Sequence, residues 1–202
     1  LMGWLGLVGS MGFGTAITKR LSEGTDRAQY KVAGILILGG FTGVILVGLL
    51  AFQSPIERYI GGRAVEFLAI LVVVGLLGTY VDAVLKGLHR VHLASLLKPV
   101  RRIMRTLLQV AGVLAGYGLV ALVLGYALGG LLMVLLGIYF IGGRYRFPAR
   151  SHLSSLFTFA KFSWLGRLSG RTFNQADIII LGVFVPSTLV GVYGVTWNLA
   201  FF

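Results

Sequence analysis

The run from Thr106 to Gly143 places the strongest constraint on the fold, because its 38 residues include no charged side chain. As one α-helix it would extend about 57 Å at 1.5 Å per residue, whereas the hydrocarbon core of a bilayer is about 30 Å thick. Two membrane-spanning helices joined by a tight turn fit this length, and we place the turn near Gly125. Such runs predict helices because a bilayer offers no hydrogen-bond partners to an open backbone.

Apolar runs of similar length occupy most of the chain. We expect further spans at Leu1–Thr18, Val32–Phe52 and Ala64–Leu85, with another beginning at Leu189. Of the 202 residues, 57% are hydrophobic and only 12% are charged, against about 25% charged in soluble domains. The sequence therefore predicts an all-α, polytopic integral membrane bundle. Its 30 glycines would let helices approach closely, and small-xxx-small pairs occur at Gly39/Gly43, Gly112/Gly116, Gly125/Gly129 and Gly166/Gly170.

Lys and Arg residues alternate between the loops in a way that predicts the topology. The loops after the first, third and fifth spans hold four, six and three of them, whereas the opposite loops hold only Arg58 and Arg63. The positive-inside rule places the richer set in the cytoplasm. This rule also explains the net charge of +12, so we expect no nucleic-acid partner.

Signatures of catalysis are missing from the sequence. It has no cysteine, no phosphate-binding P-loop and no paired carboxylates, and its loops are short and basic. The three histidines lie in or beside basic loops, where a solvated role is favoured over metal ligation: His89, His92 and His152. We therefore expect no enzyme, no cofactor and no metal.

One apolar segment, Leu156–Val185, carries ionisable side chains within it. Arg167, Arg171 and Asn174 are spaced i, i+4, i+7, which puts them on one stripe of a helix, and Asp177 lies one turn beyond Asn174. Ionisable groups inside a membrane face a water-filled cavity or a partner, so this stripe is the main candidate site. The structural alternatives are that Arg167 extends to the headgroups and that Arg171 pairs with Asp177 or another helix.

The most basic stretch precedes the long uncharged run and partly continues into the next helix as an amphipathic segment. It contains a candidate cluster at the cytoplasmic mouth, formed by Lys98, Arg101, Arg102 and Arg105. These residues act mainly as topology determinants and contacts to anionic lipids, and attraction of an anionic substrate is the alternative. Asp82 and Lys86 form an i, i+4 pair that we interpret as structural, and Glu66 is expected at the outer interface.

Three stretches resemble one transporter family. GFGTAITKRLSEG (12–24) is similar to the end of its second helix, residues 85–110 resemble its link between helices four and five, and residues 159–200 resemble its seventh helix and the start of the eighth. The family comprises the polysaccharide biosynthesis flippases of the multidrug/oligosaccharidyl-lipid/polysaccharide exporter superfamily. The resemblance implies a flippase that carries lipid-linked oligosaccharide across the cytoplasmic membrane by alternating access between two helical lobes.

This resemblance gives roles to the candidate residues. A lipid-linked sugar carries a phosphate or diphosphate, which guanidinium groups bind in bidentate fashion. Arg167 and Arg171 are thus expected to anchor phosphate, Asn174 to bind sugar or phosphate, and Asp177 to couple transport to an ion. The charge of this helix exceeds what the family leads us to expect.

The expected organisation is a first-lobe bundle of about five helices (1–143), a basic cytoplasmic linker (144–155) and the start of a second lobe (156–202). The chain is expected to be a fragment that lacks the first helix of the family. Expected partners are membrane lipids, lipid-linked oligosaccharide and glycan-assembly proteins, in the cytoplasmic membrane of a prokaryote. Alternative functions are a multidrug or small-molecule cation antiporter of the same superfamily and a membrane-embedded polysaccharide polymerase or ligase.

Overall fold

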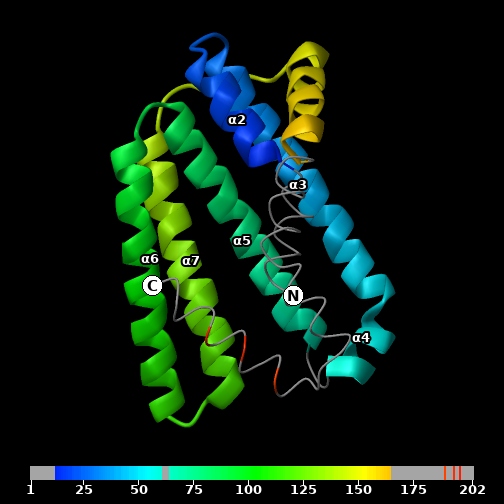
Figure 1. Cartoon of the computed structure of the whole chain (residues 1–202), viewed down its shortest axis with the longest axis vertical. Helices are drawn as coiled ribbons and strands as arrows, with labels where there is room; N and C mark the ends of the chain where they lie inside the picture. Colours follow the sequence, from blue (N-terminus) through cyan, green and yellow to red (C-terminus); the bar gives the residue numbers. More distant parts are fainter. Residues whose placement is uncertain (1–11, 61–63, 165–188, 190–192, 194–195, 197–202) are drawn as a thin grey trace. The chain divides into compact units, whose positions relative to one another are not determined.

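The computed structural model describes residues 12–60 and 64–164, together with 189, 193 and 196. The chain divides into two compact units, Leu1–Ser163 and Trp164–Phe202, and the elements below belong to the first. These are the helices α2 (Phe13–Ser22), α3 (Arg27–Ala51), α4 (Gln53–Ile60), α5 (Ala64–Gly87), α6 (Val91–Leu114) and α7 (Gly118–Ile141), followed by a helical stretch from residue 150 (Figure 1). Helices are the only regular secondary structure in the described part of the chain.

Three of the described helices, α3, α5 and α7, are long and apolar enough to cross a membrane. Their mean hydropathies over the most apolar 18 residues are 2.4, 2.3 and 2.6. They confirm the all-α, polytopic membrane class and the expected spans at Val32–Phe52 and Ala64–Leu85, although α3 begins earlier, at Arg27. The part of the first expected span before Gly12 lies outside the described residues.

The prediction of a turn near Gly125 is wrong. The helices α6 and α7 are separated by residues 115–117, and Gly125 lies within α7. The end of α6 is a Schellman motif, in which the Tyr117 amide donates to the Gly112 carbonyl at 3.1 Å and the Gly116 amide donates to that of Val113 at 3.0 Å. Gly116 has φ +86, a backbone conformation that favours glycine.

Two other connections also differ from the expected loops. Residues 53–60, expected as a loop, form α4, whose Pro55 lies in the first turn, where its missing N–H costs nothing. The basic stretch is helical throughout from Val91, because α5 closes at once in a second Schellman motif. There the Arg90 amide donates to the Leu85 carbonyl at 2.9 Å, and His89 takes the left-handed position with φ +61.

Glycines of α7 set the spacing of the bundle. A Cβ at Gly130 would overlap Val74 of α5, and one at Gly137 would overlap Val81, seven residues further along both helices. The helices α5 and α7 therefore run parallel in close contact, as small residues permit in membrane proteins. Opposite ends of the bundle hold the α5–α6 connection and the α6–α7 turn (Figure 1).

The helical stretch from residue 150 packs on α2. The rings of Phe13 and Phe157 meet edge to face at 5.0 Å, and Leu156 and Ala160 are buried in the same apolar core. The Lys19 ammonium lies 4.5 Å from the centre of the Phe159 ring. The helix thus begins within the segment expected as a linker, while the division into two lobes stays a prediction.

Candidate functional site

A stripe of polar side chains runs along α6. Lys98, Arg101, Arg105 and Gln109 are spaced by three, four and four residues, so they lie on one face of the helix. Arg102, the fourth residue of the expected mouth cluster, lies four residues after Lys98 and three before Arg105, so it borders the same face, where it is more exposed than Arg101 and Arg105. All four cluster residues are within the helix, and the charges of α6 distinguish it from the three apolar helices that could span a membrane.

The contacts between α6 and α7 fix the depth of the stripe. The two helices are antiparallel: a Cβ at Gly112 would meet Ala121 beside the turn, and one at Gly129 would lie 3.0 Å from the Arg105 Cβ. Gly129 is near the middle of α7, about 17 Å from either end at 1.5 Å per residue. Because α7 is a candidate membrane span, Arg105 lies beside the middle of a helix that could cross the membrane.

Arg105 is held by neutral partners. Its Nε donates to Gln109 Oε1 at 3.3 Å, and its guanidinium lies 4.7 Å from the centre of the Tyr126 ring. Gln109 is fixed in turn, because its Nε2 donates to the Leu122 carbonyl at 2.6 Å. No ion pair between described residues includes Arg101, Arg102 or Arg105. The stripe is thus positively charged, and its guanidinium N–H groups suit an anion.

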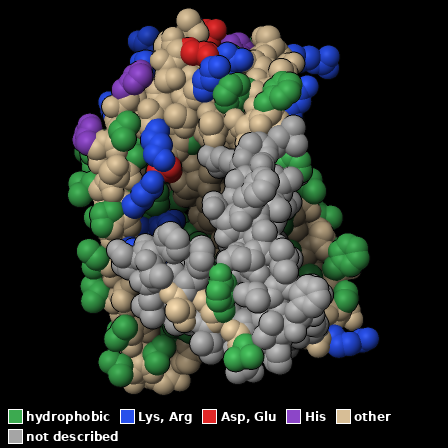
Figure 2. All heavy atoms as spheres, viewed as in Figure 1, with side chains coloured by type: hydrophobic (Ala, Val, Ile, Leu, Met, Phe, Trp, Pro, Cys, Tyr) green, Lys and Arg blue, Asp and Glu red, His purple; other side chains and the backbone are tan. Residues whose placement is uncertain are grey.

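A carboxylate balances the charge at the other end of the stripe. Asp82 of α5 pairs with Lys86 at 2.5 Å, as expected for an i, i+4 pair, and also with Lys98 of α6 at 3.4 Å. This second ion pair links α5 to α6. Figure 2 shows Lys and Arg side chains gathered at one end of the molecule, with a further basic group beside an acidic one part-way along.

The main candidates from the sequence, Arg167, Arg171, Asn174 and Asp177, lie outside the described residues, so their roles stay predictions. Sequence reasoning missed the supporting residues Gln109 and Tyr126. Gln109 was detectable, because it continues the spacing of the basic residues by one more turn. Tyr126 was not, because its approach to Arg105 depends on where the α6–α7 turn falls.

Three apolar helices long enough to cross a membrane define a multi-pass membrane protein. Comparison with known proteins agrees with this class. The sequence matches the family described as "Polysaccharide biosynthesis protein" over residues 1–200, and the chain belongs to this family. The resemblance drawn from the sequence is thereby confirmed.

Two relatives from Haloferax volcanii carry names that bear on function. The "Probable flippase AglR" is 28% identical over 193 residues, covering 95% of this chain and 40% of the relative. The "Probable low-salt glycan biosynthesis flippase Agl15" is 28% identical over 200 residues, covering 98% of this chain and 42% of the relative. The chain thus spans about two fifths of these curated relatives. No solved structure matches it.

Proposed function

We propose that this chain acts in a flippase that carries a lipid-linked oligosaccharide across a membrane by alternating access. The observation that carries the proposal is the position of Arg105, a cation at the mid-depth of an apolar bundle with no described carboxylate partner. Two relatives named as flippases and the family match support it. Flippases are transporters, so the proposal includes no chemical step.

The physical task explains why cations are needed at this depth. A lipid-linked sugar has an apolar tail that stays in the bilayer and a phosphate or diphosphate that cannot enter hydrocarbon unaided. Guanidinium groups stay charged when partly buried and bind phosphate oxygens through two parallel hydrogen bonds. Arg101 and Arg105 provide such groups along α6. We propose that Arg167 and Arg171 also bind phosphate and that Asn174 binds sugar or phosphate.

The alternative functions fit this site less well. A cationic drug would be repelled by the positively charged stripe on α6, because the carboxylate beside it, Asp82 of α5, is already paired with two lysines. A polymerase or ligase needs reacting groups, and among the described residues no three His, Asp or Glu side chains cluster as a metal site would require. We also propose that Asp177 couples transport to an ion. The protein is further proposed to lie in the cytoplasmic membrane of a prokaryote, with the basic end of the bundle in the cytoplasm.

Substitution of Arg105 tests the proposal. The full-length protein in proteoliposomes is given a lipid-linked oligosaccharide, and the fraction reaching the opposite leaflet is followed over time. Loss of a charge-assisted hydrogen bond costs about 1.5–3 kcal/mol, so Arg105→Gln should slow flipping about tenfold to a hundredfold. Arg105→Lys should retain part of the flipping rate, because lysine keeps the positive charge but cannot donate two parallel hydrogen bonds to a phosphate.

The matched control is Arg58→Gln, which removes an exposed arginine on α4. It should flip at the unaltered rate. Equal amounts of inserted protein and equal melting temperatures ensure that the comparison reports on transport. An Arg105→Gln protein that flips as fast as the Arg58→Gln protein would remove Arg105 from the mechanism.

A further inference from the structure

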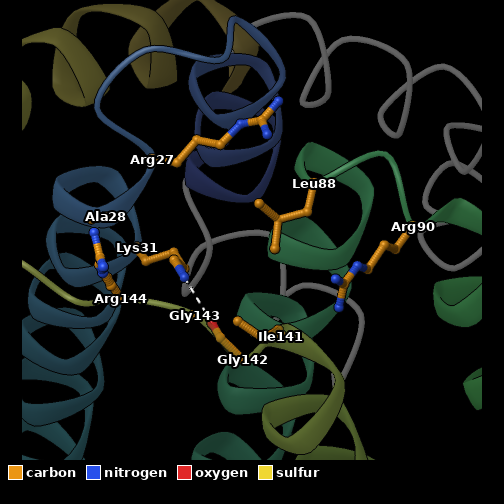
Figure 3. Close-up of a pocket in the computed structure, with 9 residues that line it drawn as sticks. All are labelled: Arg27, Ala28, Lys31, Leu88, Arg90, Ile141, Gly142, Gly143 and Arg144. Carbon is orange, nitrogen blue, oxygen red and sulfur yellow. Dashed lines mark hydrogen bonds between the residues drawn. The ribbon is translucent and has the colours of Figure 1, made fainter.

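A pocket of about 410 Å³ lies where α3 begins and α7 ends, apart from the stripe on α6. Its volume is within the range of ligand pockets, about 300–1,000 Å³. Four basic residues on three segments line it: Arg27 and Lys31 of α3, Arg90 before α6, and Arg144 after α7 (Figure 3). The full lining is Arg27, Ala28, Lys31, Leu88, Arg90, Ile141, Gly142, Gly143 and Arg144.

Lys31 is a buried member of this set. Only 4% of the residue is exposed, and its ammonium donates to the Gly142 carbonyl at 2.9 Å. The ammonium also lies 4.7 Å from the centre of the Tyr145 ring. The backbone of Lys31 is fixed as well, because the Tyr80 hydroxyl donates to its carbonyl at 3.2 Å. A positive charge is therefore built into the structure at this position.

Two further cations are oriented by carbonyls at helix ends. Arg90 donates through Nη1 to the Phe140 carbonyl in the last turn of α7. Arg27 donates through Nε to the Leu21 carbonyl near the end of α2, at 3.1 Å. A guanidinium has five N–H donors, and each of these hydrogen bonds uses one. The remaining donors can bind a ligand without loss of the structural contact.

Glycines bring the fourth cation to the pocket. Gly142 and Gly143 have φ values of +47 and +79, so the chain turns sharply at the end of α7 and places Arg144 on the lining. A Cβ at Gly143 would lie 3.2 Å from the Lys31 ammonium, so this approach also favours glycine. Arg144 is exposed, as is Arg90, whereas Lys31 and Ile141 are the buried residues of the lining.

No described carboxylate is part of the pocket lining. None of the nine lining residues is acidic, and Asp26, which directly precedes Arg27, pairs with His152. The other described carboxylates are Glu23 paired with Arg20, Asp82 with two lysines, Glu57 beside Gln53, and Glu66 in the first turn of α5. Bringing like charges together is unfavourable unless an anion joins them, so the pocket favours a multiply charged anion.

We propose that this pocket binds a phosphate or diphosphate group. Such a group presents several oxygens that accept hydrogen bonds from more than one direction, as basic residues on three different segments require. The shared chemistry has two sources, a soluble phosphate or diphosphate and the headgroup of an anionic phospholipid. The proposal does not depend on the flippase function, because it concerns binding at the end of the bundle and not passage through it.

Binding to the purified full-length protein distinguishes the sources. In nanodiscs of neutral phosphatidylcholine, titration with inorganic diphosphate measures the soluble source. In nanodiscs that contain phosphatidylglycerol, enrichment of this lipid around the protein measures the other. The test variants are Arg144→Gln, which removes one exposed arginine of the lining, and Arg90→Gln/Arg144→Gln. The control is Arg58→Gln, which removes one exposed arginine on α4.

Saturable diphosphate binding that weakens about tenfold for each arginine removed, but not in the control, establishes a soluble ligand. Lipid enrichment that is lost in the same variants, without diphosphate binding, establishes a headgroup site. If neither signal differs between Arg144→Gln and Arg58→Gln, the proposal is overturned. The Arg144→Gln comparison remains decisive if the double variant fails to fold, because the Arg144 side chain supports no described structural hydrogen bond.

Discussion

The contact between α5 and α7 makes a sharp prediction about Gly137. Replacement of Gly137 by Ala would place a Cβ in overlap with Val81 Cγ1 and 3.2 Å from its Cβ and Cγ2. Val81 is completely buried, and a β-branched side chain in a helix has one strongly preferred rotamer, so it cannot turn aside. The two helices must therefore separate. Overpacking of this kind costs about 1–3 kcal/mol.

The expected net effect includes helix propensity. Alanine is favoured over glycine in a helix by up to about 1 kcal/mol, so Gly137→Ala should lower the free energy of unfolding by about 1–2 kcal/mol. The matched control is Gly40→Ala in α3, where a Cβ would meet no described atom within 4 Å. This control should be neutral or stabilised by up to about 1 kcal/mol.

A second-site change separates the contact from other effects. Val81→Ala alone should cost about 2 kcal/mol, since it removes two buried methyl groups. Combined with Gly137→Ala it should cost less than the two changes added, with a coupling of about 0.5–3 kcal/mol. Unfolding in detergent micelles on titration with dodecyl sulfate, followed by circular dichroism, measures all four proteins. A Gly137→Ala protein as stable as Gly40→Ala, with no coupling to Val81→Ala, would refute the close packing.

Three further predictions concern the connections and the ion pair between α5 and α6. His89→Gly should raise the free energy of unfolding by about 1 kcal/mol and Gly116→Ala should lower it by a similar amount, because both positions are left-handed caps. The same titration measures both, and a loss for His89→Gly or a gain for Gly116→Ala would contradict the cap geometry. Asp82→Asn should destabilise the protein by about 1 kcal/mol because it leaves two lysines without their carboxylate. An equal loss in the control Glu57→Gln, which changes a partly exposed carboxylate outside any described ion pair, would deny the ion pair this role. Single cysteines at His89 and at Ala115 should react with membrane-impermeant maleimide from opposite sides of a vesicle, and labelling from the same side would overturn the hairpin topology.

Sequence patterns located helices better than their ends. An uncharged run of 38 residues predicted two helices, yet glycine alone could not place their turn, because Gly116 and Gly125 look equivalent in sequence. The structure uses them differently: Gly116 takes a positive φ at a cap, whereas Gly125 makes room for Gln109 of the facing helix. Which glycine serves packing depends on contacts between residues distant in sequence, and local pattern does not contain them.

The charge pattern likewise located the basic stretches of the chain but did not show which basic residues come together in the fold. The basic residues between 86 and 105 were counted as one loop because the positive-inside rule counts charges near span ends. In the structure these residues lie at the helix cap between α5 and α6, in the ion pairs with Asp82, and along α6. Their spacing along α6 places several of them on one face of that helix. The pocket could not be predicted, since Lys31 and Arg144 are 113 positions apart and meet only through the end of α7.

If both proposals hold, the pocket and the stripe on α6 must bind the same anion with matched strengths. Arg90 at the pocket, Lys98 and Arg105 follow one another along the chain, and at 1.5 Å per residue Lys98 and Arg105 lie about 12 and 22 Å beyond Arg90. A pathway conducts an anion only if each site is strong enough to fill and weak enough to empty. Four basic residues at the pocket would retain a diphosphate, so onward movement requires a second attraction at depth. Under the two proposals Arg105 would provide that attraction, and the ion pair of Lys98 with Asp82 would weaken the hold of Lys98 on the anion.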